Sequence, residues 1–414
     1  MARLRHGTIA ALDIGSTKVC CFIAQAGDDG RLNMAGFGHQ GSKGVRAGTI
    51  VDMDGVEESV LNAVHAAEQM AGEQIQNVIV NLSCGYPSSR TIGLEMAIDG
   101  HEVNEADIRR ALDRGREYQV DSDRNIIHSL PVGYMIDGSP GIREPRGMYG
   151  DRLGVEIHLV TAGAGAVRNL MTCIDRTHLG VDAMVVSPYA SALACLVEDE
   201  MNLGVTVIDM GGGTTTIAVF YDGEMVFTDF IPVGGIHVTN DIAHGLSTPV
   251  VHAERMKTLY GSAIASPADQ HDVIDVPPIG EADHAEPNHV PKSLLTGIIQ
   301  PRVEEIFELV RSRLELSGFA KVAGRRVVLT GGTSQLSGVR DLAALILDKQ
   351  IRMGRPTGLD GLADATGGPA FSTCAGLLTY GVEKHVAPAP WVGINPEEPA
   401  GLMGRFGQWI RVNF

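Results

Sequence analysis

The sequence contains the same short pattern twice, at residues 8–18 (TIAALDIGSTK) and 204–214 (GVTVIDMGGGT). Each copy is an apolar, β-branched run followed by Asp, any residue, Gly, a small residue and hydroxyl side chains. The run predicts a strand, and the turn after it offers backbone N–H groups and hydroxyls to a phosphate, while the Asp can hold a hydrated Mg²⁺. Two such turns facing each other would bind one nucleotide between them.

A second repeat indicates that whole domains are duplicated. Four residues recur with a constant offset of 181 positions (369 − 188): Pro188, Ser191, Ala194 and Leu196 return as Pro369, Ser372, Ala375 and Leu377. Their small and apolar spacing suits a helix that packs closely on a neighbour. A period this long indicates duplicated domains and is too long for a solenoid, so we expect an α/β chain of two related lobes.

The composition excludes several classes of function. The formal net charge of −17 argues against nucleic-acid binding, which needs a basic surface, and membrane contact would need a local basic, apolar element. The six cysteines form no CxxC pair and lie mostly among apolar residues, which indicates buried, reduced thiols. We expect no signal peptide and no membrane span, because no apolar run approaches ~20 residues.

Hydrophobic periodicity divides the chain into lobes. Strands are expected at 8–14, 19–25, 32–38, 77–82, 183–186, 205–209, 215–220, 225–231 and 326–330, and helices at 55–71, 163–178, 238–245, 250–260, 294–317 and 370–383. Within the first lobe, strands at 90–98, 125–136 and 153–161 and a helix at 104–117 predict a separate inserted module. The stretch 266–289 is rich in Pro, Asp and Glu and is expected to be a loop with at most a short hairpin.

These elements predict the following domains. The first lobe comprises 1–83 and 163–200, the inserted small α/β subdomain 84–162, and the second lobe 201–385, of which about 238–325 is a smaller subdomain. Residues 386–400 (VAPAPWVGINPEEPA) have the composition of a semi-extended linker, and residues 401–414 form a short tail.

The candidate nucleotide site is built from glycine-rich turns. The two Asp-Gly turns supply Asp13, Gly15, Ser16, Thr17 and Lys18, and Asp209, Gly211, Gly212, Gly213, Thr214 and Thr215, with both Asp residues as candidate Mg²⁺ ligands through water. Backbone that approaches a flat base needs glycine, which adds Gly331, Gly332 and Ser334, with Gly234 and Gly235 as a similar turn. Lys18 is either a point donor to phosphate or a surface lysine. Glu254 and Lys257 by themselves indicate only a solvated ion pair.

Together these motifs resemble the superfamily of actin, heat-shock chaperones and sugar kinases, and more closely the bacterial FtsA family of cell-division proteins. The resemblance is carried by TIAALDIGSTKV, VIDMGGGTTTIAVF, AERMKTLYGSA, IIQPRVEEIFELV and VVLTGG. It implies an actin-like, ribonuclease H-like duplicated ATPase fold with ATP and Mg as cofactors. It also implies that the insert replaces the usual second subdomain of the first lobe, and that Glu254 and Lys257 contact the ribose.

One position departs from the chaperone-like relatives. They place an acid just before the proline that is Pro188 here, whereas this chain has Ser187. Without a carboxylate to orient water, we expect no catalytic residue and at most slow ATP hydrolysis.

The tail is the second candidate functional element. Its apolar helical face would carry Leu402, Met403, Phe406, Trp409 and Ile410, and its basic face Arg405 and Arg411. Such a helix either docks on the protein's own core or lies on a membrane surface, and the Pro-rich tether and interfacial Trp favour the membrane. Two glycines weaken the helix by ~1 kcal/mol each, so binding is expected to be weak for a monomer and firm for a filament.

The FtsA resemblance implies a protein that polymerises on the cytoplasmic side of the inner membrane, at the division site. There it would anchor filaments of the tubulin-like protein FtsZ and recruit later membrane proteins of division. Lys292 and Arg302 are candidate contacts for the FtsZ C-terminal peptide, on a helix expected to begin with Pro301 at its first turn; alternatively, Arg302 only pairs with Glu305. The rival functions are a small-molecule kinase and a pilus-assembly protein of the same superfamily.

Overall fold

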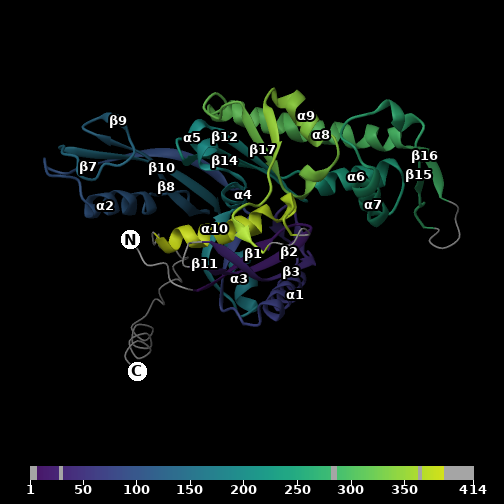
Figure 1. Ribbon diagram of the computed structural model, residues 1–414, viewed down its shortest axis with the longest axis horizontal. Helices are drawn as coiled ribbons and strands as arrows, with labels where there is room; N and C mark the ends of the chain where they lie inside the picture. The colour runs from purple at the N-terminus through teal and green to yellow at the C-terminus, as the bar shows by residue number, and fades with distance from the viewer. Residues whose placement is uncertain (1–6, 28–30, 281–286, 362–365, 387–414) are drawn as a thin grey trace.

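The computed structural model describes residues 7–27, 31–280, 287–361 and 366–386, which form two lobes with a separate sheet at one end (Figure 1). The sheet of the first lobe has the order β11-β6-β1-β2-β3-β19, and that of the second lobe β14-β13-β12-β17-β18. The first sheet contains β1 (Thr8–Ile14), β2 (Lys18–Ala26), β3 (Leu32–Gly41), β6 (Asn77–Leu82), β11 (Gly180–Val186) and β19 (Leu359–Asp360). The second contains β12 (Val205–Met210), β13 (Thr215–Tyr221), β14 (Glu224–Ile231), β17 (Arg326–Thr330) and β18 (Gln350–Met353).

The two sheets share one topology. In each, the first strand pairs antiparallel with the next, which pairs antiparallel with the third, while the remaining neighbours run parallel. The strands β1 and β12 are almost entirely buried, as their apolar, β-branched sequences require. The predicted duplication of an α/β lobe is therefore confirmed, and equivalent turns follow equivalent strands.

Helices cover these sheets. In the first lobe they are α1 (Met53–Ala71) and α3 (Ala164–Arg176), with the short strands β4 (Val45–Arg46) and β5 (Thr49–Ile50) before α1. The next helix, α4 (Ser187–Cys195), packs, among the strands, mainly on β12 and β13 of the second lobe. Helix α1 begins at Asp52, whose carboxylate accepts from two backbone N–H groups, and ends at Gly72 in the left-handed conformation. It packs on β2 and β3 through the apolar stripe that the sequence predicted, including Val56, Val60 and Ala67. Two further helices, α5 (Glu198–Leu203) and α9 (Val339–Leu347), were not among the elements expected from the sequence.

The insert forms a third sheet with its own core. Its order is β7 (Ser88–Ala97), β10 (Arg152–Gly163), β8 (Arg124–Ile136) and β9 (Ser139–Ile142), with α2 (Glu105–Arg116) against one face. Asn104 caps α2 in a reciprocal arrangement with Asp107. The edge strand β7 meets β14 of the second lobe, where the Ser89 hydroxyl donates to the Thr228 carbonyl over 2.9 Å.

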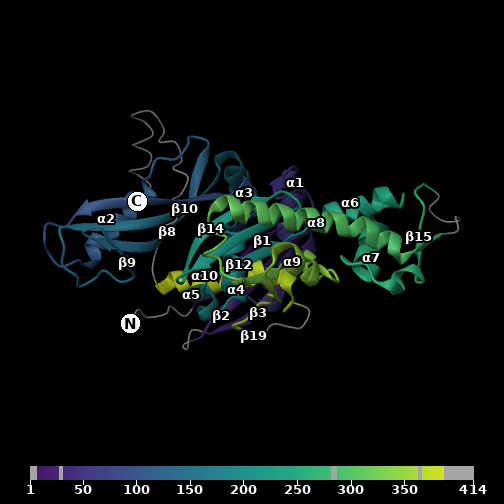
Figure 2. The ribbon, with the colours of Figure 1, turned by 90° about the horizontal axis from the view of Figure 1, so that it is seen from above.

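A small helical subdomain lies at the opposite end of the long axis from the insert (Figures 1 and 2). It contains α6 (Gly235–Gly245), α7 (Val250–Tyr260), α8 (Lys292–Ser317) and a short hairpin of β15 (Val273–Val276) and β16 (Asn288–Pro291). This hairpin agrees with the expectation of a loop carrying at most a short hairpin. The prediction that Pro301 begins a helix is wrong, because Pro301 lies inside α8. Buried residues on both sides of it, such as Ile299 and Val303, hold the helix together across the missing N–H group.

The two repeated helices pack against each other. A Cβ added at Gly376 of α10 (Ser372–Val386) would lie 1.6 Å from the Ala190 carbonyl of α4, so the two backbones touch, as the small-residue spacing suggested. Helix α10 also packs on β1, β2 and β6, and its Leu377 and Leu378 share the core of the first lobe. The expectation that this helix closes the second lobe is therefore corrected: the chain returns to the first lobe.

Candidate functional site

The two glycine-rich turns have the same backbone geometry. In the first, the Gly15 N–H donates to the Lys18 carbonyl over 2.9 Å, and in the second the Gly211 N–H donates to the Thr214 carbonyl over 2.8 Å. The strands on either side also share one register, with Ile14 opposite Val19 and Met210 opposite Thr215. The repeated sequence thus folds into a repeated hairpin.

The two turns face each other across a cleft between the lobes. A Cβ on Gly212 would lie 2.2 Å from Thr17 Cγ2, and one on Gly213 would lie 2.4 Å from Ser16 Oγ. A side chain at either glycine would fill the narrow space between the turns. The described turns therefore provide backbone and hydroxyl groups from both sides, as the proposal of two facing phosphate turns requires.

Two adjoining cavities form this cleft, and both are lined by Thr17, Gly212 and Gly332. The inner cavity, about 140 Å³, is lined among others by Asp13, Gly15, Ser16, Lys18, Asp209, Gly211, Gly213, Thr214 and Gly331. The outer cavity, about 540 Å³, is lined among others by Gly235, Glu254, Lys257, Thr333 and Leu336. The polar inner space suits phosphates, and the larger outer space suits a nucleoside.

Two buried carboxylates end the strands β1 and β12. Burial raises the pKa of Asp13 to about 6; the Lys18 cation opposes this shift, and the nearby Asp209 carboxylate adds to it. The pKa of Asp209 is also raised by burial. Asp209 Oδ2 accepts from Ser191 of α4 at 2.5 Å and from Thr373 of α10 at 3.1 Å, which hold it in place. Two close carboxylates beside an open cavity are hard oxygen donors that fit a hydrated Mg²⁺.

The Gly331-Gly332 turn lies directly against the second phosphate turn. Gly331 has a positive φ of 87°, and a Cβ on it would lie 2.3 Å from Asp209 Oδ1. The following Thr333 hydroxyl donates to the Gly211 carbonyl over 2.8 Å. Glycine at 331 is thus required both by its left-handed backbone and by the approach to Asp209.

Lys18 lies in the cleft and is engaged by the segment that leads into α10. Its ammonium group donates to the Ala370 carbonyl and lies 3.6 Å from the centre of the Phe371 ring. It lines the inner cavity, so it is not an ordinary surface lysine. The contact links the first phosphate turn to the repeated helix of α10.

Residues of both α6 and α7 line the outer cavity. Helix α6 begins at the Gly234-Gly235 turn, where the Gly235 N–H donates to the Gly211 carbonyl over 3.1 Å. Lys257 Nζ contacts Glu254 Oε2 at 2.6 Å, the Thr239 hydroxyl at 2.8 Å and the Gly235 carbonyl at 3.1 Å. The ion pair expected from the sequence is therefore present, and it lines the cavity at the same time.

Three predicted site residues line neither cavity. The Thr215 hydroxyl donates to the Val233 carbonyl and the Ser334 hydroxyl to the Gly331 carbonyl, while Gly234 is buried against the second turn. These residues shape the turns instead of facing the cleft. Both cavities are also lined by residues that were not predicted as binding residues. Chain neighbours of the predicted turns and of Lys257 contribute Thr216, Ile236, Thr258, Leu259, Gly261, Thr333, Gln335, Leu336 and Ser337, whereas Asn81, Ser83, Ser187, Ala370 and Thr373 come from distant segments.

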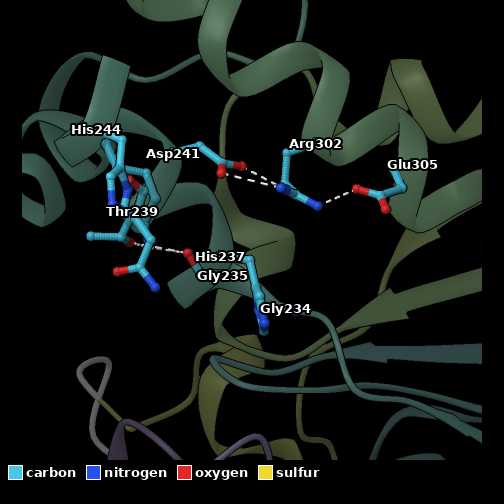
Figure 3. A network of polar contacts seen from close by, with 10 residues as sticks. Gly234, Gly235, His237, Thr239, Asp241, His244, Arg302 and Glu305 are labelled. Atoms are coloured by element: carbon cyan, nitrogen blue, oxygen red, sulfur yellow. Dashed lines mark hydrogen bonds and ion pairs between the residues drawn. The ribbon is translucent and has the colours of Figure 1, made fainter. Parts of the chain in front are cut away.

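The two candidate partner-binding cations are paired within the chain. Arg302 Nε donates to Asp241 Oδ2 of α6 over 2.6 Å, and Arg302 Nη1 forms an ion pair with the Glu305 carboxylate, as Figure 3 shows. Lys292 Nζ lies 3.1 Å from the buried carboxylate of Asp269. The alternative expected from the sequence, an Arg302–Glu305 pair, is thus present, and Asp241 adds a second partner. Their role toward another protein stays a prediction.

Comparison with known proteins identifies the family. The profile described as "Cell division protein FtsA" matches residues 206–376, and that of the "SHS2 domain inserted in FTSA" matches residues 85–161. Cell division protein FtsA of Agrobacterium fabrum is 45% identical over 425 residues, covering 99% of this chain and 96% of its own length. The chain belongs to the FtsA family. The FtsA proteins of Pseudomonas aeruginosa (100% of both chains) and Escherichia coli K12 (98% of both) are 36% and 32% identical.

Solved structures agree on the actin-like fold of this FtsA-family protein. The PilM-PilN type IV pilus biogenesis complex matches with a TM-score of 0.64 at 16% identity, over 90% of this chain and 98% of that one. MreB5 of Spiroplasma citri bound to ADP matches with a TM-score of 0.53 at 14% identity, over 92% and 99%. Family membership makes this a cell-division protein, which decides against the kinase and pilus-assembly alternatives.

The predicted membrane-binding tail lies outside the described residues, as do the rest of 387–414. Within the described ranges, no helix is both long and apolar enough to cross a membrane.

Proposed function

We propose that this FtsA-family protein binds MgATP in the cleft between its two lobes. The observation that carries the proposal is the direct opposition of Gly212 to Thr17 and of Gly213 to Ser16. Asp13 and Asp209 would hold the hydrated Mg²⁺, which supplies positive charge beside the phosphates. The backbone of both turns would bind the phosphates, and the cavity lined by Glu254 and Lys257 would take the nucleoside.

Hydrolysis should be slow. The Ser187 hydroxyl donates to the Leu82 carbonyl over 3.3 Å and accepts from Asn81 over 3.2 Å, so this position offers a hydroxyl already in use and no carboxylate. A general base would have to come from elsewhere. A turnover at or above ~1 s⁻¹ on the purified protein would show that another residue activates water.

In the cell, the protein would polymerise at the division site, on the cytoplasmic side of the inner membrane. Its basic, amphipathic tail would supply membrane affinity, which filaments multiply by avidity. The small subdomain around α8 would bind the FtsZ C-terminal peptide, and later membrane proteins of division would join the assembly. Two solved neighbours support the nucleotide assignment, since MreB5 of Spiroplasma citri was solved bound to ADP and bound to AMPPNP.

Calorimetry with MgATP tests the cleft. The parent protein should bind, and Gly212→Val should abolish binding because its side chain would occupy the space next to Thr17. Gly165→Ala is a matched control, since a Cβ there meets no atom within 4 Å. Co-sedimentation with anionic liposomes, with and without ATP, followed by electron microscopy of the pellet, tests the filament. Binding of MgATP by the Gly212→Val protein at parental affinity would show that the cleft is misassigned.

A further inference from the structure

A large groove lies at the end of the first-lobe sheet that is remote from the nucleotide cleft. It has a volume of about 590 Å³, within the range of ligand-binding pockets. It is lined at the start of β1 by Thr8, whereas Asp13, near the other end of β1, lines the cleft. Asp13 lies five positions beyond Thr8, which corresponds to ~16 Å at ~3.3 Å per residue. The proposed nucleotide chemistry makes no use of this groove.

The groove has an apolar floor and a polar rim. Ile9, Ile79, Ala183 and Tyr380 form the floor, and each is less than a tenth exposed. The rim carries polar side chains: Glu73, Gln74, Gln76, Asn77 and Asp182. The Glu73 carboxylate already accepts from the Thr8 hydroxyl over 2.7 Å. An apolar floor between amide and carboxylate groups suits an extended peptide that inserts one large side chain and hydrogen-bonds through its backbone.

The chain itself delivers such a peptide to this place. Tyr380 and Gly381, which line the groove, lie on α10, whose last residue is Val386. The next residues read Ala-Pro-Ala-Pro-Trp-Val-Gly-Ile, with Trp391 five positions beyond Val386. A chain in the polyproline II conformation, which proline favours, spans ~3.1 Å per residue, so five residues could extend ~15 Å. The helix from Gly381 to Val386 rises only ~7.5 Å, so a chain that turns back can reach the groove.

We propose that the Trp391 side chain docks in this groove and holds the linker against the first lobe. A tryptophan in a Pro-rich linker exposes a large apolar surface unless it is covered, and this groove, with its apolar floor, is lined by Tyr380 and Gly381 of α10 itself. The acidic Glu397 and Glu398 follow five or more residues later and would be repelled by Glu73 and Asp182 toward solvent. The tail, residues 401–414, would then be attached to the first lobe at a fixed point near Thr8 of β1. It would not hang from a freely moving linker.

Tryptophan fluorescence of the full-length chain in lipid-free solution tests the proposal, because the two tryptophans of the sequence are Trp391 and Trp409. Trp409→Phe leaves Trp391 as the reporter. Its emission should be blue-shifted, and its acrylamide quenching several-fold weaker, relative to the same protein in denaturant. The matched control Trp391→Phe leaves Trp409 as the reporter, which should be quenched nearly as strongly as in denaturant. A solvent-exposed Trp391 overturns the proposal.

Hydrogen exchange provides a second, independent readout. Trp391→Ser should cause several-fold faster exchange in peptides covering 73–79 and 380–382, while Trp409→Ser should leave these peptides unchanged. Filling the groove with Ala183→Leu, in the Trp409→Phe background, should expose Trp391; if that variant fails to fold, the exchange comparison still decides. Unchanged exchange after Trp391→Ser would show that another segment, such as residues 1–6, covers the groove. Protection that appears only as protein concentration rises would assign it to a second copy; either result refutes the proposal.

Discussion

Replacing Asp13 by Asn should stabilise the nucleotide-free protein while removing its response to Mg²⁺. Burial raises the pKa of Asp13 from 3.8 to about 6, which means that the folded state disfavours the ionised carboxylate. Below the pKa of 3.8 that Asp13 has in the unfolded chain, this carboxyl group does not lower the free energy of unfolding, because it is protonated in both states. As the pH rises through the folded-state pKa of about 6, that stability is lost. At neutral pH this difference corresponds to about 3 kcal/mol. A neutral amide of similar shape removes that penalty.

Urea unfolding of parent and Asp13→Asn proteins, without nucleotide, measures this difference. At about pH 7.5 the variant should be more stable by up to about 3 kcal/mol, and at about pH 4, near the unfolded pKa, the two proteins should converge. Addition of MgATP at ~100 times its Kd should stabilise the parent by ~2.7 kcal/mol and the variant far less. Asp209→Asn is the matched control: Asp209 accepts hydrogen bonds from Ser191 and Thr373, so its loss of charge should give a smaller gain.

The reasoning would be refuted if Asp13→Asn unfolded at the same or a lower urea concentration than the parent at neutral pH while keeping a native circular dichroism spectrum. It would also be refuted if the variant kept the full Mg²⁺-dependent stabilisation. The first result would mean that the carboxylate is not penalised by burial, and the second that Mg²⁺ is held without Asp13.

Three other perturbations test separate parts of the molecule. Gly376→Ala drives a Cβ into the α4 backbone and should lower the free energy of unfolding by ~3 kcal/mol or more, measured in urea. Arg302→Glu should weaken binding of the acidic FtsZ C-terminal peptide at least tenfold in fluorescence anisotropy, or ~1.4 kcal/mol, and equal affinity would remove Arg302 from the site. Trp409→Glu should cost ~2 kcal/mol or more of membrane partitioning and leave MgATP affinity unchanged; parental liposome binding would place the anchor elsewhere.

Local structure could be predicted where one segment determines its own environment. The strands at 77–82 and 326–330 match their predicted bounds because a short apolar run, buried by both neighbours, ends at polar or glycine residues. Helix α8 shows the opposite case. The rule that proline starts a helix failed at Pro301, because the buried stripe on either side stabilises more than the missing hydrogen bond costs.

The contacts across the cleft could not be read from the sequence. The partners of Asp209 lie 18 positions before it and 164 after it, and only the fold brings them together. The repeat did contain a signal, since Ser191 belongs to the duplicated Pro-x-x-Ser motif. The two copies are nevertheless used differently. Ser191 holds Asp209, whereas Ser372 pairs with the Thr330 hydroxyl at 2.7 Å.

The ion-pair partners of Arg302 show the same limit. Arg302 and Glu305 are three residues apart on one helix, so their pairing was visible in the sequence. Asp241 is 61 positions away, and it changes the meaning of Arg302. Asp241 lies on α6 (Figure 3). The N–H group of Gly235, the first residue of α6, donates to the Gly211 carbonyl of the second phosphate turn. A peptide that competes for Arg302 therefore competes with a carboxylate of the helix that begins at the nucleotide cleft. If nucleotide shifts α6, peptide affinity must shift with it, and by linkage the peptide must alter nucleotide affinity by the same factor.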